Sequence, residues 1–297
     1  MRKSFTYLIS SITGILCFFG GTALYAQESA VASCPVAPAY YGPNAFPIPE
    51  MGFGRTCSEL NLEAGAALAL HKGFSIREDA TVDAYFKLRI PLFTPRVNLT
   101  IWGEAYDWFQ AGAAANATRG LKGACRGGKV GEIFVSTDIQ ALRQEKHYID
   151  LMVRAALKSA AGEFSQYNRY YDSPGYFFDV VLGREFAIGQ NMAFRLAASA
   201  GFLCWQTEDH TQNDAPMYGI ATGFSYGCFN IGAQYGGYVG WRKDGDRPMS
   251  IRVEAKVAVG QLDILVKYQE GLIDWPYRQM SVGVAYRFDI LKQNKQR

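Results

Sequence analysis

The strongest constraint on this chain is an alternation of apolar and polar residues with a period of two, repeated along most of its length. The last run is the clearest, with polar or small residues between its apolar members Met280, Val282, Val284, Tyr286 and Phe288. Successive side chains of a β-strand point to opposite faces of the sheet, so this run predicts a strand with one apolar and one polar face.

Runs of this kind predict twelve strands. They lie near 60–72, 81–93, 96–109, 129–142, 147–160, 175–186, 192–206, 216–226, 228–241, 249–258, 261–271 and 277–290. The connections between them are alternately short and long, and no long helix pattern follows residue 26. An even number of strands, with short turns at one rim and longer loops at the other, is the plan of an antiparallel up-and-down transmembrane β-barrel. A soluble β-sandwich also alternates, and it is the competing interpretation.

Composition excludes other classes of protein. The chain is 49% hydrophobic and 14% aromatic but only 19% charged, which is too apolar for an intrinsically disordered protein. It has only one long apolar run, at the N-terminus, so it is not a bundle of membrane helices. A net charge of +3 gives no reason to expect a nucleic-acid partner.

The first 26 residues have the three-part pattern of a secretory signal peptide. Arg2 and Lys3 precede an apolar stretch, and small residues lead to a predicted cleavage site after Ala26, with cleavage after Ala23 as the alternative. A retained N-terminal anchor helix is the alternative. Export makes disulfides permissible, and Cys34 and Cys57 bracket a Pro-rich stretch that they could close. We therefore expect a Pro-rich periplasmic N-terminal segment at 27–59, which is also a candidate plug.

Two further features favour a membrane barrel over a sandwich. Charged residues lie in the middle of the polar faces, and aromatic residues gather towards strand ends, as an interfacial belt requires. These aromatic residues are Trp108, Phe109, Phe186, Trp205, Tyr218, Tyr226, Trp241, Tyr268 and Trp275.

The C-terminal strand carries a resemblance to a known class. Ser281, Gly283, Tyr286 and Phe288 resemble the terminal-strand assembly signal of Gram-negative outer-membrane barrels. The resemblance implies insertion into outer-membrane lipid by the barrel-assembly machinery, with the barrel at 60–291. The chain departs from the usual pattern because residues follow Phe288, and these predict a basic periplasmic tail at 292–297. Residues 169–179 bear a slight similarity to barrels of Bacteroidetes bacteria, and no specific family is indicated.

In a closed barrel the polar faces point inwards, which gives a set of candidate lumen-facing residues. They are Asp83, Lys87, Arg89, Glu104, Glu132, Asp138, Asp150, Arg154, Lys158, Asp179, Glu185, Arg195, Arg252, Glu254, Lys256, Asp263, Lys267 and Arg287. Acids and bases are equal in number, so no single-sign ladder selects an ion. Twelve strands leave a lumen between the filled interior of small barrels and the open channel of large porins. The sequence therefore predicts a narrow pore for small polar solutes, with a plugged, ion-paired lumen as the alternative.

The sequence gives little support to an enzymatic function. The three histidines, His71, His147 and His210, lack partners in a catalytic spacing, and no pattern for a metal or another cofactor occurs. A surface enzyme acting on lipid or peptide is the last of three hypotheses. The second is a structural or interaction barrel that displays 110–128 and 161–174 as binding loops.

Overall fold

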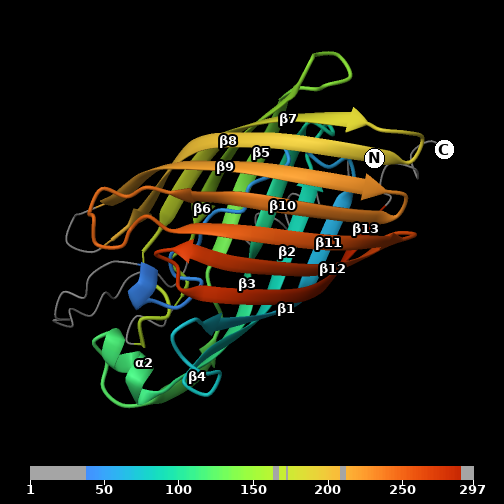
Figure 1. Ribbon diagram of the computed structural model, residues 1–297. Coiled ribbons are helices and arrows are strands. Elements are labelled where there is room, and N and C mark those ends of the chain that lie inside the picture. The colour runs from blue at the N-terminus through green and yellow to red at the C-terminus, as the bar shows by residue number, and fades with distance from the viewer. Residues whose placement is uncertain (1–37, 163–166, 172, 208–211, 289–297) are drawn as a thin grey trace, which may run out of the picture. The chain divides into compact units, whose positions relative to one another are not determined.

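The computed structural model describes residues 38–162, 167–171, 173–207 and 212–288. Most of them belong to one antiparallel sheet (Figure 1). Its strands are β1 (Leu60–His71), β2 (Asp79–Pro91), β3 (Val97–Ala111), β4 (Cys125–Lys129), β5 (Ile133–Leu142), β6 (Asp150–Lys158), β7 (Gly175–Ala187), β8 (Met192–Gln206), β9 (Gln212–Tyr226), β10 (Phe229–Tyr238), β11 (Met249–Val259), β12 (Leu262–Ile273) and β13 (Tyr277–Phe288). Two short helices accompany them, η1 (Pro38–Tyr40) and α2 (Ala113–Thr118).

The sheet closes on itself. β1 pairs with β2 on one side and with β13 on the other, and every other neighbour is also antiparallel. β4 and β5 both pair with β3, β4 along Asp107–Ala111 and β5 along Val97–Gly103, so they share one position in the wall. The result is a closed barrel of twelve strands, which confirms the predicted fold class.

The two rims of the barrel differ in the length of their connections. At the short-turn rim, 92–96, 143–149, 188–191, 227–228 and 260–261 join consecutive strands. At the long-loop rim the connections include 112–132, which carries α2 and β4 (Figure 1). The six-residue helix α2 lies in a loop where the alternating pattern indicates no helix. None of the helices in the described part is long and apolar enough to cross a membrane.

The wall has its apolar side chains outside and its charged side chains inside. Exposed apolar residues include Leu62, Val82, Val153, Val180, Leu196, Ile220, Ile231, Val253, Ile264, Val266, Val282 and Val284. Buried charged residues include Glu63, Asp83, Arg154, Asp179, Arg195 and Asp263. This is the reverse of a soluble protein, and it is the arrangement of a barrel surrounded by lipid.

The predicted aromatic belt is wrong for three of its members. Trp108, Phe186, Tyr226, Trp241 and Tyr268 are exposed on the outside of the barrel. Phe109, Trp205 and Trp275 are buried, with 0%, 1% and 4% of their surfaces exposed. Their position near a strand end does not decide which face they occupy, and these three fill the lumen at the long-loop rim.

The seam between the first and last strands depends on two glycines. Gly65 of β1 lies opposite Gly283 of β13, and the hydroxyl of Tyr85 lies close to both. A Cβ atom at Gly65 would overlap the backbone carbonyl oxygen of Val282, and rigid backbone cannot yield as a side chain can.

We therefore expect Gly65→Ala to lower the free energy of unfolding by about 1–3 kcal/mol, the usual range for overpacking. The measurement is urea unfolding of the refolded barrel, followed by tryptophan fluorescence. Gly189→Ala is the matched control, because a Cβ atom there meets nothing within 4 Å. Equal stability of the two variants would contradict a tight seam.

Candidate functional site in the barrel lumen

Residues 38–59, which we call the lumenal segment, lie inside the barrel and extend along it. Near the long-loop rim, Trp275 donates a hydrogen bond from Nε1 to the carbonyl oxygen of Pro43 at 3.1 Å. Near the short-turn rim, the backbone N–H of Cys57 donates to Oδ1 of Asn98 at 2.7 Å. The contacts lie at opposite ends of the barrel, because Trp275 precedes β13 and Asn98 begins β3. Residues 27–37 of the predicted N-terminal segment lie outside the described residues.

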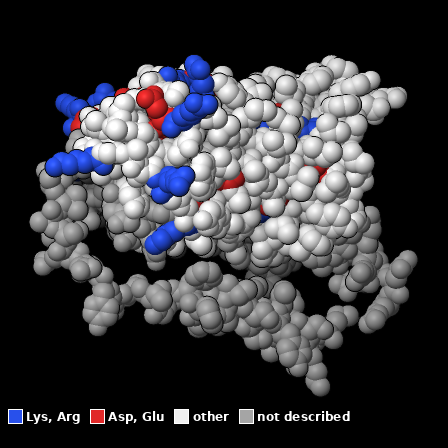
Figure 2. Space-filling model, turned by 90° about the horizontal axis from the view of Figure 1, so that it is seen from below, with Lys and Arg blue, Asp and Glu red and all other residues white. Residues whose placement is uncertain are grey.

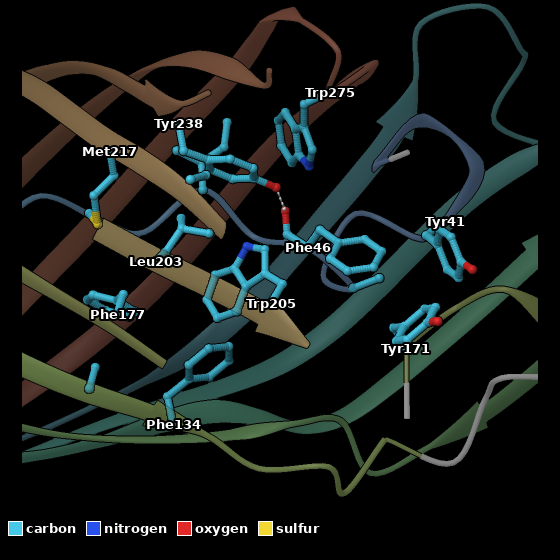
Figure 3. Close-up of a cluster of buried hydrophobic side chains, with 14 of the residues drawn as sticks. Tyr41, Phe46, Phe134, Tyr171, Phe177, Leu203, Trp205, Met217, Tyr238 and Trp275 are labelled. Carbon is cyan, nitrogen blue, oxygen red and sulfur yellow. Dashed lines mark hydrogen bonds between the residues drawn. The ribbon is translucent and has the colours of Figure 1, made fainter. Parts of the chain in front are cut away.

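Buried apolar side chains join the lumenal segment to the wall at the long-loop rim (Figure 3). The cluster includes Tyr41, Phe46 and Ile48 from the segment and Phe134, Phe177, Leu203, Trp205, Met217, Tyr238, Trp275 and Tyr277 from the barrel. Phe46 is only 2% exposed, and the hydroxyl of Tyr238 donates to its carbonyl oxygen at 3.5 Å. Segment and wall are thus in direct apolar contact at this end.

Further along the lumen, wall side chains bind the backbone of the segment. Arg154, Arg195 and Gln140 donate to the carbonyl oxygens of residues 50, 53 and 54 at 2.9, 2.8 and 2.8 Å. Arg252 donates to the carbonyl oxygens of residues 48 and 49. Hydrogen bonds from charged donors are stronger than neutral ones, so the backbone of residues 48–54 is held firmly against the wall.

Three ion pairs between segment and wall add to these contacts, and one of them joins Arg55 to Glu185 at 3.1 Å. Nζ of Lys87 lies 2.6 Å from a carboxylate oxygen of Glu50. The buried carboxylate of Asp150 bonds Arg55 of the segment at 2.8 Å and Arg195 of the wall at 2.7 Å. The wall thus compensates the charges of Glu50 and Arg55.

Beside the segment runs a cavity of about 670 Å³. The segment forms one side of it, and strands β1–β3 and β11–β13 contribute much of the other. Its acidic residues are Glu50, Glu59, Glu63, Asp83, Glu104, Asp138, Glu254 and Asp263. Its basic residues are Arg55, Lys87, Arg89, Arg154, Arg252, Lys256, Lys267 and Arg287. The equal numbers leave the cavity close to neutral.

Twelve of the eighteen residues predicted from the sequence line this cavity. The other six are Glu132, Asp150, Lys158, Asp179, Glu185 and Arg195, and all of them form ion pairs. The pairs of Lys158 with Glu132 and of Arg154 with Asp179 are almost completely buried, at 2.6 and 2.8 Å. That any of the eighteen contacts a solute stays a prediction.

A β-bulge in β3 explains why Asp107 faces the lumen although the alternation does not predict it. Ala84 pairs with Tyr106 and Tyr85 with Glu104, so Ala105 has no partner on β2. The extra residue changes which positions face inwards, and Asp107 is buried although it has the opposite parity to Glu104. Strict alternation could not place it.

The loops of the long-loop rim bring further charges to the top of the lumen. Arg119, from the loop of α2, pairs with Asp79 and donates to the hydroxyl of Tyr277 at 2.9 Å. Burial by itself lowers the pKa of Arg119. The nearby Tyr277 and Asp79 raise it by more than burial lowers it, so the pKa of Arg119 lies above its ordinary value. The hydroxyl of Tyr170 donates to Asp107 at 3.1 Å, and burial together with nearby carboxylates raises the pKa of Tyr170 well above its usual range.

Other lumenal charges were missed for simpler reasons. Glu50 and Arg55 lie in the Pro-rich segment, where no alternation of apolar and polar residues shows which side chains point into the lumen. Glu63 belongs to β1 and bonds Lys267 at 2.5 Å. It lies two residues after the buried Asn61, and the period of two carries the signal that could have found it.

The remaining predicted residues are widely separated. His71 ends β1 at the long-loop rim and His147 is exposed in a short turn, so these two do not share a site, and His210 lies outside the described residues. Cys57 is a free thiol among the described cysteines, whereas Cys34 lies outside the described residues, so the proposed disulfide stays a prediction. In the described part, no group of three His, Cys, Asp or Glu side chains is placed to hold a metal.

The predicted assembly signal occupies β13. Tyr286 and Phe288 point outwards at the short-turn rim, and Gly283 lies in the seam. Its recognition by assembly machinery stays a prediction. The signal peptide and the basic tail lie outside the described residues.

Neither a protein-family model nor a curated protein matches this chain. Among solved structures, it is similar to the KdgM porin in complex with disordered oligogalacturonate, at 9% identity and a TM-score of 0.41, covering 76% of this chain and 99% of that one. The NanC porin is similar at 8% identity and a TM-score of 0.45, covering 77% and 100%. The COG4313 outer membrane channel from Pseudomonas putida F1 is similar at 13% identity and a TM-score of 0.48, covering 82% and 100%.

These likenesses concern the fold alone. The closed twelve-stranded wall, its apolar outer face and its charged lumen define an outer-membrane β-barrel. The prediction of that class from the terminal strand and the alternation is confirmed.

Proposed function

We propose that the barrel is a narrow pore for small polar solutes and that the lumenal segment is its constriction. The observation that carries this proposal is the charged cavity of about 670 Å³ beside the segment. A lumen that served only to hold strands together would need no such space. Fixed charges of both signs keep water and polar solutes favourable inside the barrel.

The apolar cluster at the long-loop rim favours a second candidate, a plugged barrel that displays its loops for binding. Trp205, Phe46 and Tyr238 are almost completely buried there. Loop residues close over the segment, since the backbone N–H of Gly42 donates to the carbonyl oxygen of Asn168 at 2.8 Å. In this candidate the cavity is a vestibule rather than a passage.

Conductance of the refolded mature chain in a planar bilayer tests the pore. Discrete, salt-dependent current steps are expected. A folded barrel that shows no steps and takes up no solute in a liposome-swelling assay would refute the proposal and favour the plugged barrel.

Modification of Cys57 tests the path. Cys57 lines the cavity, so in a variant whose only cysteine is Cys57, a charged methanethiosulfonate reagent should reduce the current by at least about half. Burial raises the pKa of the Cys57 thiol, so less thiolate exists at neutral pH, and labelling should accelerate as the pH rises above neutral. A variant whose only cysteine is Cys228, exposed in a short turn, is the control and should keep its current after labelling.

A further inference from the structure

Exposed charges are distributed unevenly between the two rims. In the described part of the long-loop rim, every exposed charged residue is basic: Lys72, Arg77, Lys122, Arg126, Lys129, Arg242, Lys243, Arg247 and Arg278. At the short-turn rim, the exposed charged residues among those described are Arg55, Glu145 and Lys146. Figure 2 shows Lys and Arg gathered at one end of the molecule, beside a barrel wall made largely of uncharged residues.

The nine bases lie along one part of the rim, and we call this set of residues the basic arc. They lie in or beside the β10–β11, β12–β13, β1–β2 and β3–β5 connections, which are consecutive around the barrel. Backbone groups link each connection to the next. The N–H of Arg247 donates to Asp274, that of Lys72 to Pro276 and that of Gly112 to Glu78, at 3.0, 2.8 and 2.6 Å. The connections that carry the bases are therefore direct neighbours along the rim.

Much of this charge is not compensated by the acidic side chains that the structure describes. Lys72 and Arg278 share Glu270, and Arg242 pairs with Asp244. Among the described residues, no acidic side chain pairs with Arg77, Lys122, Arg126, Lys243 or Arg247. Like charges held close together repel one another, so the arc is stabilised by an anionic partner.

The arc also lies at a definite level relative to lipid. Exposed apolar and aromatic side chains lie next to it, including Trp241 beside Arg242, Ile76 beside Arg77 and Met280 near Arg278, with exposed fractions of 69%, 53% and 55%. In membrane proteins, an aromatic girdle marks the boundary of the hydrocarbon region, and the headgroup phosphates lie just beyond it. Basic residues outside the girdle are thus at the height of those phosphates.

We propose that the basic arc binds the phosphate groups of an anionic lipid headgroup in the leaflet at the long-loop rim. Several arginines and lysines spaced over four connections suit a headgroup with more than one phosphate, because each base contacts a separate oxygen. A base near an anionic surface contributes about a fivefold change in affinity. This site is on the outside of the barrel and does not depend on conduction through the lumen.

The test uses the refolded mature chain in neutral detergent, titrated with a bisphosphorylated diglucosamine lipid, with bound lipid counted by native mass spectrometry. The variant carries Arg77→Gln, Lys122→Gln, Arg126→Gln, Lys243→Gln and Arg247→Gln. We expect its affinity for the lipid to be lower by about a hundredfold or more. The single variant Arg126→Gln, which disturbs the surface less, should lose about fivefold.

Arg96→Gln together with Lys146→Gln, at the short-turn rim, is the matched control and should bind within about twofold of the unchanged chain. Raising salt from 0.15 M to 1 M should weaken binding, since the screening length falls from about 8 Å to about 3 Å. The proposal would be overturned if the five-site variant bound the lipid as tightly as the unchanged chain does. It would also be overturned if the unchanged chain bound the lipid equally well after removal of its phosphates. Full competition by millimolar inorganic phosphate would assign the arc to free phosphate and would overturn the lipid as its ligand.

Discussion

A mature chain that begins at Gly52 should conduct at least about three times more current than the full mature chain, because it lacks the larger part of the lumenal segment and a twelve-stranded wall with less inside it encloses a wider channel. The deletion removes most of the apolar contacts at the long-loop rim that involve Tyr41, Phe46 and Ile48. It also removes the backbone acceptors of Arg252 and the carboxylate partner of Lys87, whereas Arg154 loses one acceptor and keeps Asp179. Lys87 and Arg252 line the widened lumen, so we also expect a shift towards anion selectivity.

The measurement is single-channel conductance and reversal potential in a salt gradient. A chain that keeps the segment but carries Thr56→Ser is the control, since this change preserves the hydroxyl that bonds the carbonyl oxygen of Pro95. If the full chain is silent and the shortened chain conducts, the segment is a plug. If both conduct equally, the segment does not constrict the lumen, and if both are silent, the pore proposal fails.

Arg154→Met should lower the free energy of unfolding by about 3–5 kcal/mol, the usual effect of breaking a buried ion pair from one side. Two nitrogens of Arg154 bond the two carboxylate oxygens of Asp179, each at 2.8 Å. The side chain of Asp179 is completely buried and that of Arg154 is 10% exposed. Without the guanidinium, the buried carboxylate loses both of these hydrogen bonds.

The double variant Arg154→Met/Asp179→Leu should recover most of the loss, because it removes both charges and their desolvation cost. Urea unfolding followed by tryptophan fluorescence measures all of these variants. Arg278→Gln is the control for an exposed pair: Arg278 is 61% exposed opposite Glu270, and its loss should cost no more than about 1 kcal/mol. A double variant as unstable as the single one would show that the charge of Asp179 is not the cause.

Much of the wall could be predicted from local pattern. The predicted strand at 192–206 matches β8, and 60–72 differs from β1 by one residue. Alternation also places Asp83, Lys87 and Lys267 on the inner side, because the side-chain period of a strand does not depend on its neighbours. The closed barrel follows from the even number of strands and the alternating connection lengths.

The exceptions all involve contacts between distant parts of the chain. Asp107 turns inwards because β3 has an unpaired residue, which depends on its pairing with β2. The boundary of the strand predicted at 129–142 is wrong, since β4 and β5 divide that region between two contacts with β3. Trp205 and Trp275 face the lumen because the lumenal segment offers them an apolar surface.

The sequence by itself determined that this protein is a wall of two-faced strands, because a strand's alternation is local and each residue contributes to it independently. Only the tertiary structure decided what fills the lumen that this wall encloses. Contacts across the barrel decide the course of residues 38–59 and the partners of Arg154 and Asp150. They also decide that the exposed bases gather at one rim. Such contacts are fixed by closure and register, which no single run of residues carries.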